Sequence, residues 1–279
     1  MFEPLEGRVL FSAPIDTSGV ALFDPNGNAA VINKHKAVWF LIHGNNMSKD
    51  LMLDTAKAVQ GQLNTQWQVL IVDWSQLAYA QTNAAKNAQA VGNRVAQMIN
   101  QAHLMTSRVN LIGFSMGGTV ANRIAIDLKT RSTQVNRIVS IDVDVGRYDP
   151  IMFAADSNYS IAFGGNDRFA NVSGATLSDD GVLLTGLSPT AEFAHAQVFN
   201  IVTAIWERDA GILPGSDDIS PIFSINNILN GLPVNWRKNS YGSGYEAEMN
   251  CGNQPGFPND LGPTSLTFVN LHRHTVVLT

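Results

Sequence analysis

Short apolar runs alternate with helical segments along the first three quarters of the chain. The runs are nearly continuous in apolar residues, as is typical of strands that are buried on both faces of a sheet. They cover residues 37–42, 68–74, 108–114, 137–143 and 159–163. Segments with helical periodicity cover residues 51–63, 82–101, 117–128 and 193–207. This alternation predicts an α/β fold, in which helices cover both faces of a mostly parallel sheet.

The two ends of the chain follow other patterns. Near the N-terminus, the turn-forming segment 24–28 lies between apolar residues 20–23 and 30–32, which predicts a β-hairpin. After Asp209 the sequence is rich in Gly, Pro and Asn, with strand-like runs whose ranges are 265–269 and 275–278. The expected organisation is a leader-like segment at 1–18, an α/β domain at 19–210, and a loop-rich, β-containing C-terminal extension at 211–279 that packs on the same domain.

Composition excludes several kinds of partner. Of 279 residues only 15% are charged and the net charge is −5, so the chain lacks the basic surface that nucleic-acid binding requires. The longest apolar runs are strand-sized, well short of the ~18 residues of a membrane-spanning helix. The single cysteine, Cys251, excludes an internal disulfide and a cysteine-rich metal site. We expect no cofactor, no bound metal and no transmembrane segment.

The motif Gly-x-Ser-x-Gly at residues 113–117 lies between a predicted strand and a predicted helix. A nucleophile on such a sharp turn needs small residues two positions away on either side, so that neighbouring backbones do not collide. The turn exposes the hydroxyl of Ser115 above the N-terminus of the helix, where backbone N–H groups stabilise negative charge. The motif therefore predicts Ser115 as a nucleophile; a helix-capping serine in a glycine-flanked turn is the alternative.

The segment His43-Gly44-Asn45-Asn46 follows the first predicted interior strand. In folds with a nucleophile on a strand-to-helix turn, this upstream loop supplies a second backbone donor to the oxyanion. The sequence predicts that the N–H groups of Asn45 and Met116 form the oxyanion hole. For the His43 side chain we expect a structural role in orienting the loop rather than a catalytic one.

Four segments carry a resemblance to a known family. They read V-W-F-L-I-H-G at 38–44, V-L-I-V-D-W at 69–74, V-N-L-I-G-F-S-M-G-G at 109–118 and R-I-V-S-I-D at 137–142. Their order and spacing resemble the pancreatic-lipase and phospholipase A1 family. The resemblance implies an α/β-hydrolase fold and a Ser-Asp-His triad that acts on lipid carboxylic esters. The chain departs from the family at Phe114, where the family usually has His, and it lacks the family's paired cysteines.

The acid of a triad is expected at the carboxyl end of a strand near the serine. Asp142 ends the predicted strand 137–141 and matches the aspartate of the family's corresponding segment. Asp167 ends the next strand, where many other α/β-hydrolases keep their acid, and Asp144 shares a face with Asp142 on an extended chain. We favour Asp142 over Asp167 and Asp144. Asp73 is expected to be a structural carboxylate that binds loop backbone.

Six histidines are candidates for the base. His195 follows the acid in chain order, lies at the start of a predicted helix and resembles the family's histidine segment, so we predict His195 as the base. His35 and His103 lie in loops and are expected to be solvated. His272 and His274 share a strand face, but no carboxylate or cysteine cluster accompanies them to form a metal site.

Residues 170–192 lie where lipases of this family carry a lid. The segment is either a mobile flap over an acyl pocket or a β-hairpin packed on the domain. The function predicted from these features is a serine carboxylic-ester hydrolase of lipase or esterase type. Its substrate would be a lipid or another acyl ester, with peripheral contact to a lipid interface. The alternatives are a phospholipase A1 or acyltransferase with the same mechanism, and a catalytically weak surface protein that uses the fold for binding.

Residues 1–13 do not form an ordinary secretory signal, because no basic segment precedes an apolar stretch. They resemble the short Leu-Glu-Pro-Arg-type motif at the N-termini of surface and secreted proteins of planctomycete bacteria, with Gly7 where that motif commonly has Pro. The resemblance implies a secreted or cell-surface bacterial protein. The other interpretation is an apolar terminus that docks as an edge strand in a soluble cytoplasmic protein.

Overall fold

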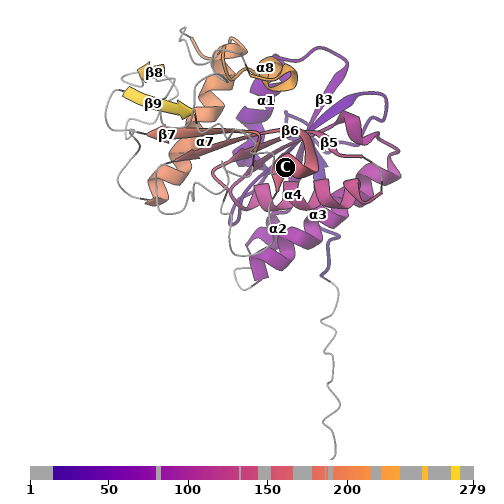
Figure 1. Ribbon diagram of the computed structural model, residues 1–279. Helices are drawn as coiled ribbons and strands as arrows, with labels where there is room; N and C mark the ends of the chain where they lie inside the picture. The colour runs from indigo at the N-terminus through magenta and orange to yellow at the C-terminus, as the bar shows by residue number, and fades with distance from the viewer. Residues whose placement is uncertain are drawn as a thin grey trace, which may run out of the picture.

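The described residues build one mixed sheet with helices on both faces (Figure 1). The computed structural model describes residues 15–79, 83–131, 133–143, 152–165, 178–185, 187, 191–214, 221–232, 247–250 and 265–270. The strands are β1 (Ala21–Phe23), β2 (Ala37–Ile42), β3 (Trp67–Asp73), β4 (Val109–Phe114), β5 (Val135–Ile141), β6 (Ser157–Gly165), β7 (Asp180–Thr185), β8 (Ala247–Asn250) and β9 (Ser265–Asn270). Within these residues the sheet has nine strands in the order β1-β3-β2-β4-β5-β6-β7-β9-β8.

The helices lie mainly in the connections between the strands. They are η1 (Lys49–Met52), α1 (Leu53–Gly61), α2 (Ser75–Ala78), α3 (Ala84–Gln101), η3 (Thr106–Arg108), α4 (Met116–Lys129), α5 (Phe153–Asp156), α7 (Ala191–Asp209) and α8 (Ile225–Asn230). Strands β2 to β7 pair in parallel, whereas β1, β8 and β9 pair antiparallel at the two edges. The predicted α/β architecture is therefore confirmed, including all five predicted interior strands.

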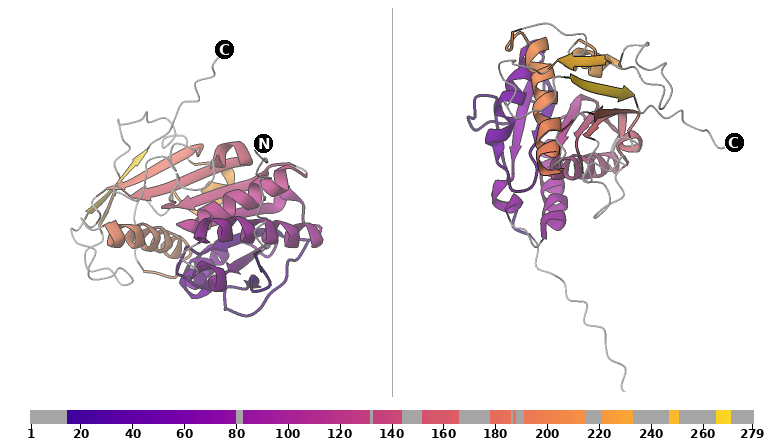
Figure 2. Two further views of the ribbon diagram at one scale, coloured as in Figure 1. Left: turned by 90° about the horizontal axis from the view of Figure 1, so that it is seen from below. Right: turned by 90° about the vertical axis from the view of Figure 1, so that its left-hand side faces the viewer.

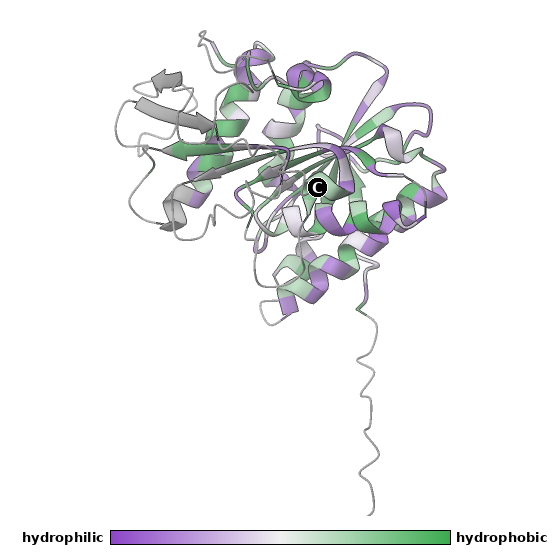
Figure 3. Cartoon of the chain, viewed as in Figure 1, coloured by the Kyte–Doolittle hydropathy of each residue, from purple (hydrophilic) through white to green (hydrophobic). Residues whose placement is uncertain are grey.

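Alternation along each strand separates the core into two layers. In β2, Trp39 and Leu41 face the layer formed with α1 and α7, while Val38, Phe40 and Ile42 face the layer formed with α3 and α4. Two views show these helices on opposite faces of the sheet (Figure 2). Hydrophobic colour follows the strands, and hydrophilic colour marks the outer faces of the helices (Figure 3). Because both faces are covered, the interior strands are nearly continuous in apolar residues, as the sequence predicted.

The C-terminal part of the chain joins the same sheet. Strand β9 pairs with β7, and β8 pairs with β9. Arg137 of β5 binds helix α8. Its guanidinium donates hydrogen bonds to the carbonyls of Ile228 and Leu229. The same guanidinium stacks on the ring of Tyr159, 5.4 Å from its centroid, and the Tyr159 hydroxyl donates to Asp180 of β7. These contacts attach α8 to three strands of the sheet.

The predicted N-terminal hairpin forms only in part. Residues 24–28 form the expected turn, held by the Asp24 carboxylate, and a single antiparallel bridge joins Phe23 to Ala29 across it. Residues 30–32 form no strand, and the ladder of β1 is with β3. The side chain of Gln68 explains the difference, because it donates to the carbonyl of Val31 and accepts from the N–H of Asn33. It thereby takes the place of a strand partner. Val31 points into solvent and is 82% exposed.

Of the two interpretations of residues 170–192, the structure excludes the flap for residues 180–185 and favours a β-segment packed on the domain, although this segment is a strand of the central sheet and not a hairpin. This segment is β7, an interior strand between β6 and β9, and its Val182 and Leu184 are fully buried in the core. Because β7 pairs with a strand on each side and buries these side chains, residues 180–185 cannot open as a lid. The predicted strand 275–278, residues 170–177, 186 and 188–190 of the predicted flap, and residues 1–14 of the leader segment lie outside the described residues.

Candidate active site

Ser115 occupies a strained turn between β4 and α4. Its backbone φ is 53° and its ψ is −128°, a region that L-residues rarely adopt. A hydrogen bond of 2.9 Å from the Ser115 N–H to the carbonyl of Ile141 helps to hold this geometry. The flanking glycines are required by close contacts: a Cβ on Gly113 would lie 2.5 Å from the Gly117 carbonyl oxygen, and one on Gly117 would lie 2.2 Å from the Ile42 carbonyl oxygen. The motif thus forms the sharp turn that its spacing predicted.

Two backbone segments approach the serine from opposite directions. Helix α4 begins at Met116, and its first turn carries no acidic side chain, so its N–H groups face the serine without a competing anion. On the other side, a Cβ on Gly44 would lie only 2.9 Å from Cβ of Ser115. The loop that carries Asn45 therefore passes directly beside the serine. Both predicted oxyanion donors belong to segments in contact with Ser115 or next to it in the chain.

Asp142 and His195 are joined by a short hydrogen bond. Nδ1–H of His195 donates to Oδ2 of Asp142 at 2.5 Å, and the Asp142 side chain is fully buried. Asp142 directly follows β5 with a φ of 47°, and its own N–H donates to the carbonyl of Phe163 at 2.7 Å. The N–H of Gly165 donates to its other carboxylate oxygen at 3.1 Å. Of the three candidate acids, Asp142 makes the contact expected of the triad acid.

Asp144 and Asp167, the alternatives for the acid, lie outside the described residues. The end of β6 nevertheless has a defined role, because both the Phe163 carbonyl and the Gly165 N–H hold Asp142. A Cβ on Gly165 would lie 2.7 Å from Cδ1 of Leu187 and 3.0 Å from Cγ2 of Val198, so a larger residue does not fit without displacement. Strand β6, after which many α/β-hydrolases carry their acid, thus positions Asp142, which follows the neighbouring strand β5.

The imidazole of His195 is bound at one nitrogen and one ring face. With Nδ1 donating to Asp142, Nε2 carries the lone pair of the neutral ring. The side chain is 24% exposed. The ring of Phe114 stacks on the imidazole, with centroids 4.8 Å apart and an interplanar angle of 24°. The sequence did not predict this contact. Its one signal is Phe114 itself, which stands where the family that the chain resembles usually has His.

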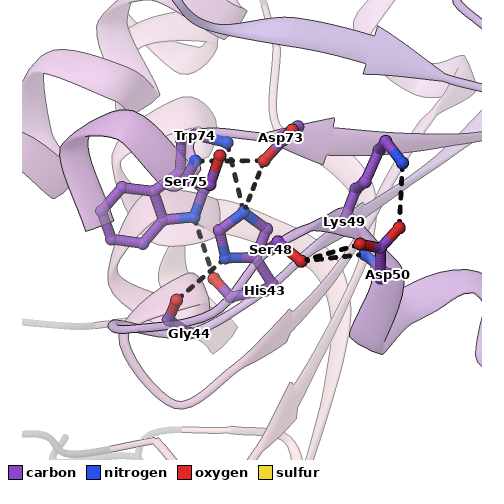
Figure 4. Close-up of polar contacts among 8 residues, drawn as sticks. All are labelled: His43, Gly44, Ser48, Lys49, Asp50, Asp73, Trp74 and Ser75. Atoms are coloured by element: carbon purple, nitrogen blue, oxygen red, sulfur yellow. Dashed lines mark hydrogen bonds and ion pairs between the residues drawn. The ribbon is translucent and has the colours of Figure 1, made fainter. Parts of the chain in front are cut away.

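A second histidine–aspartate pair lies at the carboxyl ends of β2 and β3 (Figure 4). His43 is fully buried and stacks on Trp74, with ring centroids 5.4 Å apart. Its Nδ1–H donates to the Gly44 carbonyl at 2.9 Å, and its Nε2 lies 3.2 Å from both Oδ1 of Asp73 and the Trp74 N–H. The indole N–H of Trp74 donates back to the His43 carbonyl. His43 thus holds the loop beside the serine, as expected.

Asp73 is a structural carboxylate, as the sequence predicted. Oδ1 accepts a hydrogen bond of 3.0 Å from the Ser75 N–H at the start of α2. Partial burial by itself raises the pKa of Asp73. Hydrogen bonds from His43 and Ser75 and the attraction of His43 outweigh burial, so this pKa lies below its usual value.

The remaining described histidines, His35 and His103, are exposed as expected, and His272 and His274 lie outside the described residues. Within the part of the chain that the structure describes, no group of three or more His, Cys, Asp or Glu side chains is arranged to hold a metal ion. Among the same residues, no helix is long and apolar enough to cross a membrane.

The parallel sheet, the helices on both faces and the strained serine turn after β4 define the class: the protein has the α/β-hydrolase fold. Residues 20–150 match the model of the Lipase family, and this range contains β1 to β5, Ser115 and Asp142 but not His195. The chain therefore has the α/β-hydrolase fold, and over residues 20–150 it is similar to the Lipase family. Among curated proteins the sequence has no match.

Three solved structures resemble the chain distantly. A hydrolase of the α/β superfamily from Xanthomonas campestris pv. campestris has 15% identity and a TM-score of 0.41, over 61% of this chain and 99% of that one. A hormone-sensitive lipase from a metagenome library has 12% identity and a TM-score of 0.39, over 53% and 63%. A lipase-esterase related protein from Clostridium acetobutylicum has 19% identity and a TM-score of 0.29, over 41% and 45%. The chain thus spans less than two thirds of the latter two proteins.

Proposed function

We propose that the protein is a serine carboxylic-ester hydrolase in which Ser115 is the nucleophile, His195 the general base and Asp142 the acid. The observation that carries this proposal is the 2.5 Å hydrogen bond between His195 and a buried Asp142, at the same edge of the sheet as the strained Ser115 turn. Strain of this kind persists only where the surrounding structure enforces it, and it is concentrated at functional sites.

The mechanism follows from the roles of these groups. Nε2 of His195 removes the proton of the Ser115 hydroxyl as Oγ attacks the ester carbonyl. The N–H groups of Met116 and Asn45 stabilise the oxyanion, and loss of one such donor typically costs about 3 kcal/mol. The protonated His195 then gives its proton to the leaving alcohol. Water, activated by the same imidazole, hydrolyses the acyl-enzyme and releases the carboxylic acid. Asp142 holds the correct tautomer and stabilises the imidazolium throughout.

For the substrate we propose a lipid or another acyl ester, on the strength of the Lipase family match. Phospholipase A1 activity and acyl transfer to another acceptor use the same acyl-enzyme. For the location we propose export to the cell surface or medium, on the strength of the motif-like residues 1–13 alone.

Covalent labelling tests the nucleophile most directly. A fluorophosphonate probe reacts with an activated serine, so we expect the wild-type protein to be labelled at Ser115, and we expect no labelling of Ser115→Ala. The exposed Ser107, on the opposite edge of the sheet, provides the matched control: Ser107→Ala should be labelled as the wild type is. A folded wild-type protein that resists labelling would refute the enzyme assignment and favour a binding protein.

Hydrolysis assays test the substrate class. We expect Ser115→Ala to lower kcat by about 10⁴-fold or more, with almost unchanged stability because the substitution is small. A panel of p-nitrophenyl esters with increasing acyl length, measured beside phospholipid and triacylglycerol substrates, identifies the preferred ester. Activity of Ser115→Ala within about tenfold of the wild type would mean that another residue is the nucleophile.

A further inference from the structure

We propose that Phe114 is a positioning residue for the catalytic imidazole: its ring supports one face of His195 and holds the base in the plane that joins Asp142 to Ser115. The inference rests on the proposed function of His195. It assigns a specific task to the residue at which this chain departs from the histidine of the family that it resembles.

The hydrogen bond to Asp142 is not sufficient to fix the imidazole. It restrains Nδ1 alone, and a ring held at one atom can still tilt about that contact and move Nε2. A planar contact on the ring face removes this freedom. The separation of 4.8 Å and the angle of 24° between Phe114 and His195 correspond to an offset stack, the arrangement that aromatic pairs prefer.

Phe114 is itself firmly held. It is 1% exposed and packs in the core layer between the sheet and α7. Its ring also contacts Phe199, with centroids 4.6 Å apart. Phe199 lies one helical turn after His195 on α7, so the two side chains share a helix face. Phe114 therefore contacts two successive turns of the helix that carries the base, and α7 cannot shift without disturbing this column.

The position of Phe114 in the chain links the base to the nucleophile. Phe114 is the last residue of β4, and Ser115 follows it directly at the strained turn. One short, buried strand end thus carries both the nucleophile and the support of the imidazole. The face of a phenyl ring is also the negative side of its quadrupole, which favours the imidazolium that forms when His195 takes the serine proton.

The test compares two leucine substitutions in the same aromatic column. Phe114→Leu removes the ring that stacks on the imidazole, whereas Phe199→Leu removes the other aromatic ring that contacts Phe114. With p-nitrophenyl esters we expect Phe114→Leu to lower kcat by about 10- to 100-fold, because small displacements of a catalytic group have effects of this size. We expect KM to change by less than about threefold, since the ring supports the base and not the substrate. Phe199→Leu should keep most of kcat.

A spectroscopic measurement separates this proposal from the proposed function. The Nδ1 proton that His195 shares with Asp142 should give a low-field proton resonance, which does not depend on turnover. We expect Phe114→Leu to shift or broaden it and Phe199→Leu to leave it nearly in place. If the wild-type protein shows the resonance but no labelling at Ser115, the proposed function fails and the positioning role is still decided by the two variants.

Two results would overturn the positioning role. One is a folded Phe114→Leu protein that keeps both kcat and the resonance of the wild type. The other is an equal loss in both variants, which would indicate general packing. If Phe114→Leu does not fold, Phe114→Met, which fills a similar volume with a flexible side chain, carries the same expectations and the same refutation.

Discussion

The two histidine–aspartate pairs of this molecule have the same parts and different surroundings. Each pair lies at the carboxyl edge of the sheet, and each imidazole stacks on an aromatic ring. His43 is 0% exposed and contacts protein groups through both nitrogens, while His195 is 24% exposed and uses Nδ1 for its partner. An imidazole with both nitrogens engaged holds a loop, whereas one with a single described partner fits the general base that we propose.

The burial of the two aspartates differs in the opposite sense. Asp142 is fully buried and accepts at 2.5 Å, held by the end of β6. Asp73 lies at 3.2 Å from its histidine and is 18% exposed, and it shares its oxygen with the Ser75 N–H. The comparison teaches that residue type and spacing do not separate the proposed catalytic pair from a structural one. Burial and the distribution of hydrogen bonds do.

Removing the His195 imidazole should have the largest effect. We expect His195→Ala to lower kcat by about 10⁵-fold, because the base and the nucleophile act as a unit. Stability should fall by about 1–3 kcal/mol, because the substitution leaves the buried Asp142 carboxylate without its partner. Steady-state kinetics and urea denaturation measure the two quantities. An activity within about tenfold of the wild type would exclude His195 as the base.

Neutralising Asp142 should have the next largest effect. The amide of Asp142→Asn keeps the shape of the carboxylate but can hold the wrong imidazole tautomer, so we expect kcat to fall by about 10⁴-fold. Asp167→Asn is the matched control and should lose much less activity. A larger loss in Asp167→Asn than in Asp142→Asn would reverse the assignment of the acid, while the reaction class would stand.

The corresponding change in the structural pair should act mainly on stability. His43→Ala leaves a cavity and removes the partners of the Gly44 carbonyl and the Trp74 N–H, which should cost about 2–4 kcal/mol of unfolding free energy. Since the loop beside Ser115 loosens, kcat should fall by about 10- to 100-fold. The exposed His35→Ala is the control and should match the wild type in both. A stable His43→Ala protein with a 10⁵-fold loss would make His43 catalytic instead.

The smallest effect is a pH dependence at Asp73. Its pKa is lowered in the folded state, so its carboxylate contributes stability that is present above the unfolded pKa of about 3.9 and is lost as pH falls through the folded value. We expect Asp73→Asn to cost at most about 1 kcal/mol near neutral pH, and this difference from the wild type should shrink below about pH 4. Urea denaturation across this range measures it. A difference that grows on acidification would contradict the direction of the shift.

The local pattern of apolar residues predicted the structure correctly for the segments that form the interior strands and the helices that cover them. The interior strands and the four long helices appear as the periodicity indicated, because the requirement to bury apolar residues acts on each segment separately. Two differences from the sequence-based expectations, at residues 30–32 and at residues 180–185, come from contacts between segments. The Gln68 side chain binds backbone groups of Val31 and Asn33, with which a longer hairpin arm would have paired. The position of β7 depends on its pairing with both β6 and β9, which no local pattern shows.

The sequence by itself determined the strand–turn–helix at Ser115, because its glycines act on neighbouring backbone within a few residues and on the adjacent strand end. It also determined the α/β architecture, because periodic apolar residues are local. Only the tertiary structure decided which aspartate meets His195 and which ring supports it. Asp142 and His195 lie 53 residues apart, and their contact depends on β6 holding the carboxylate and on α7 packing against β4. Such contacts between distant elements arise from the packing of the whole sheet, and no short pattern encodes them.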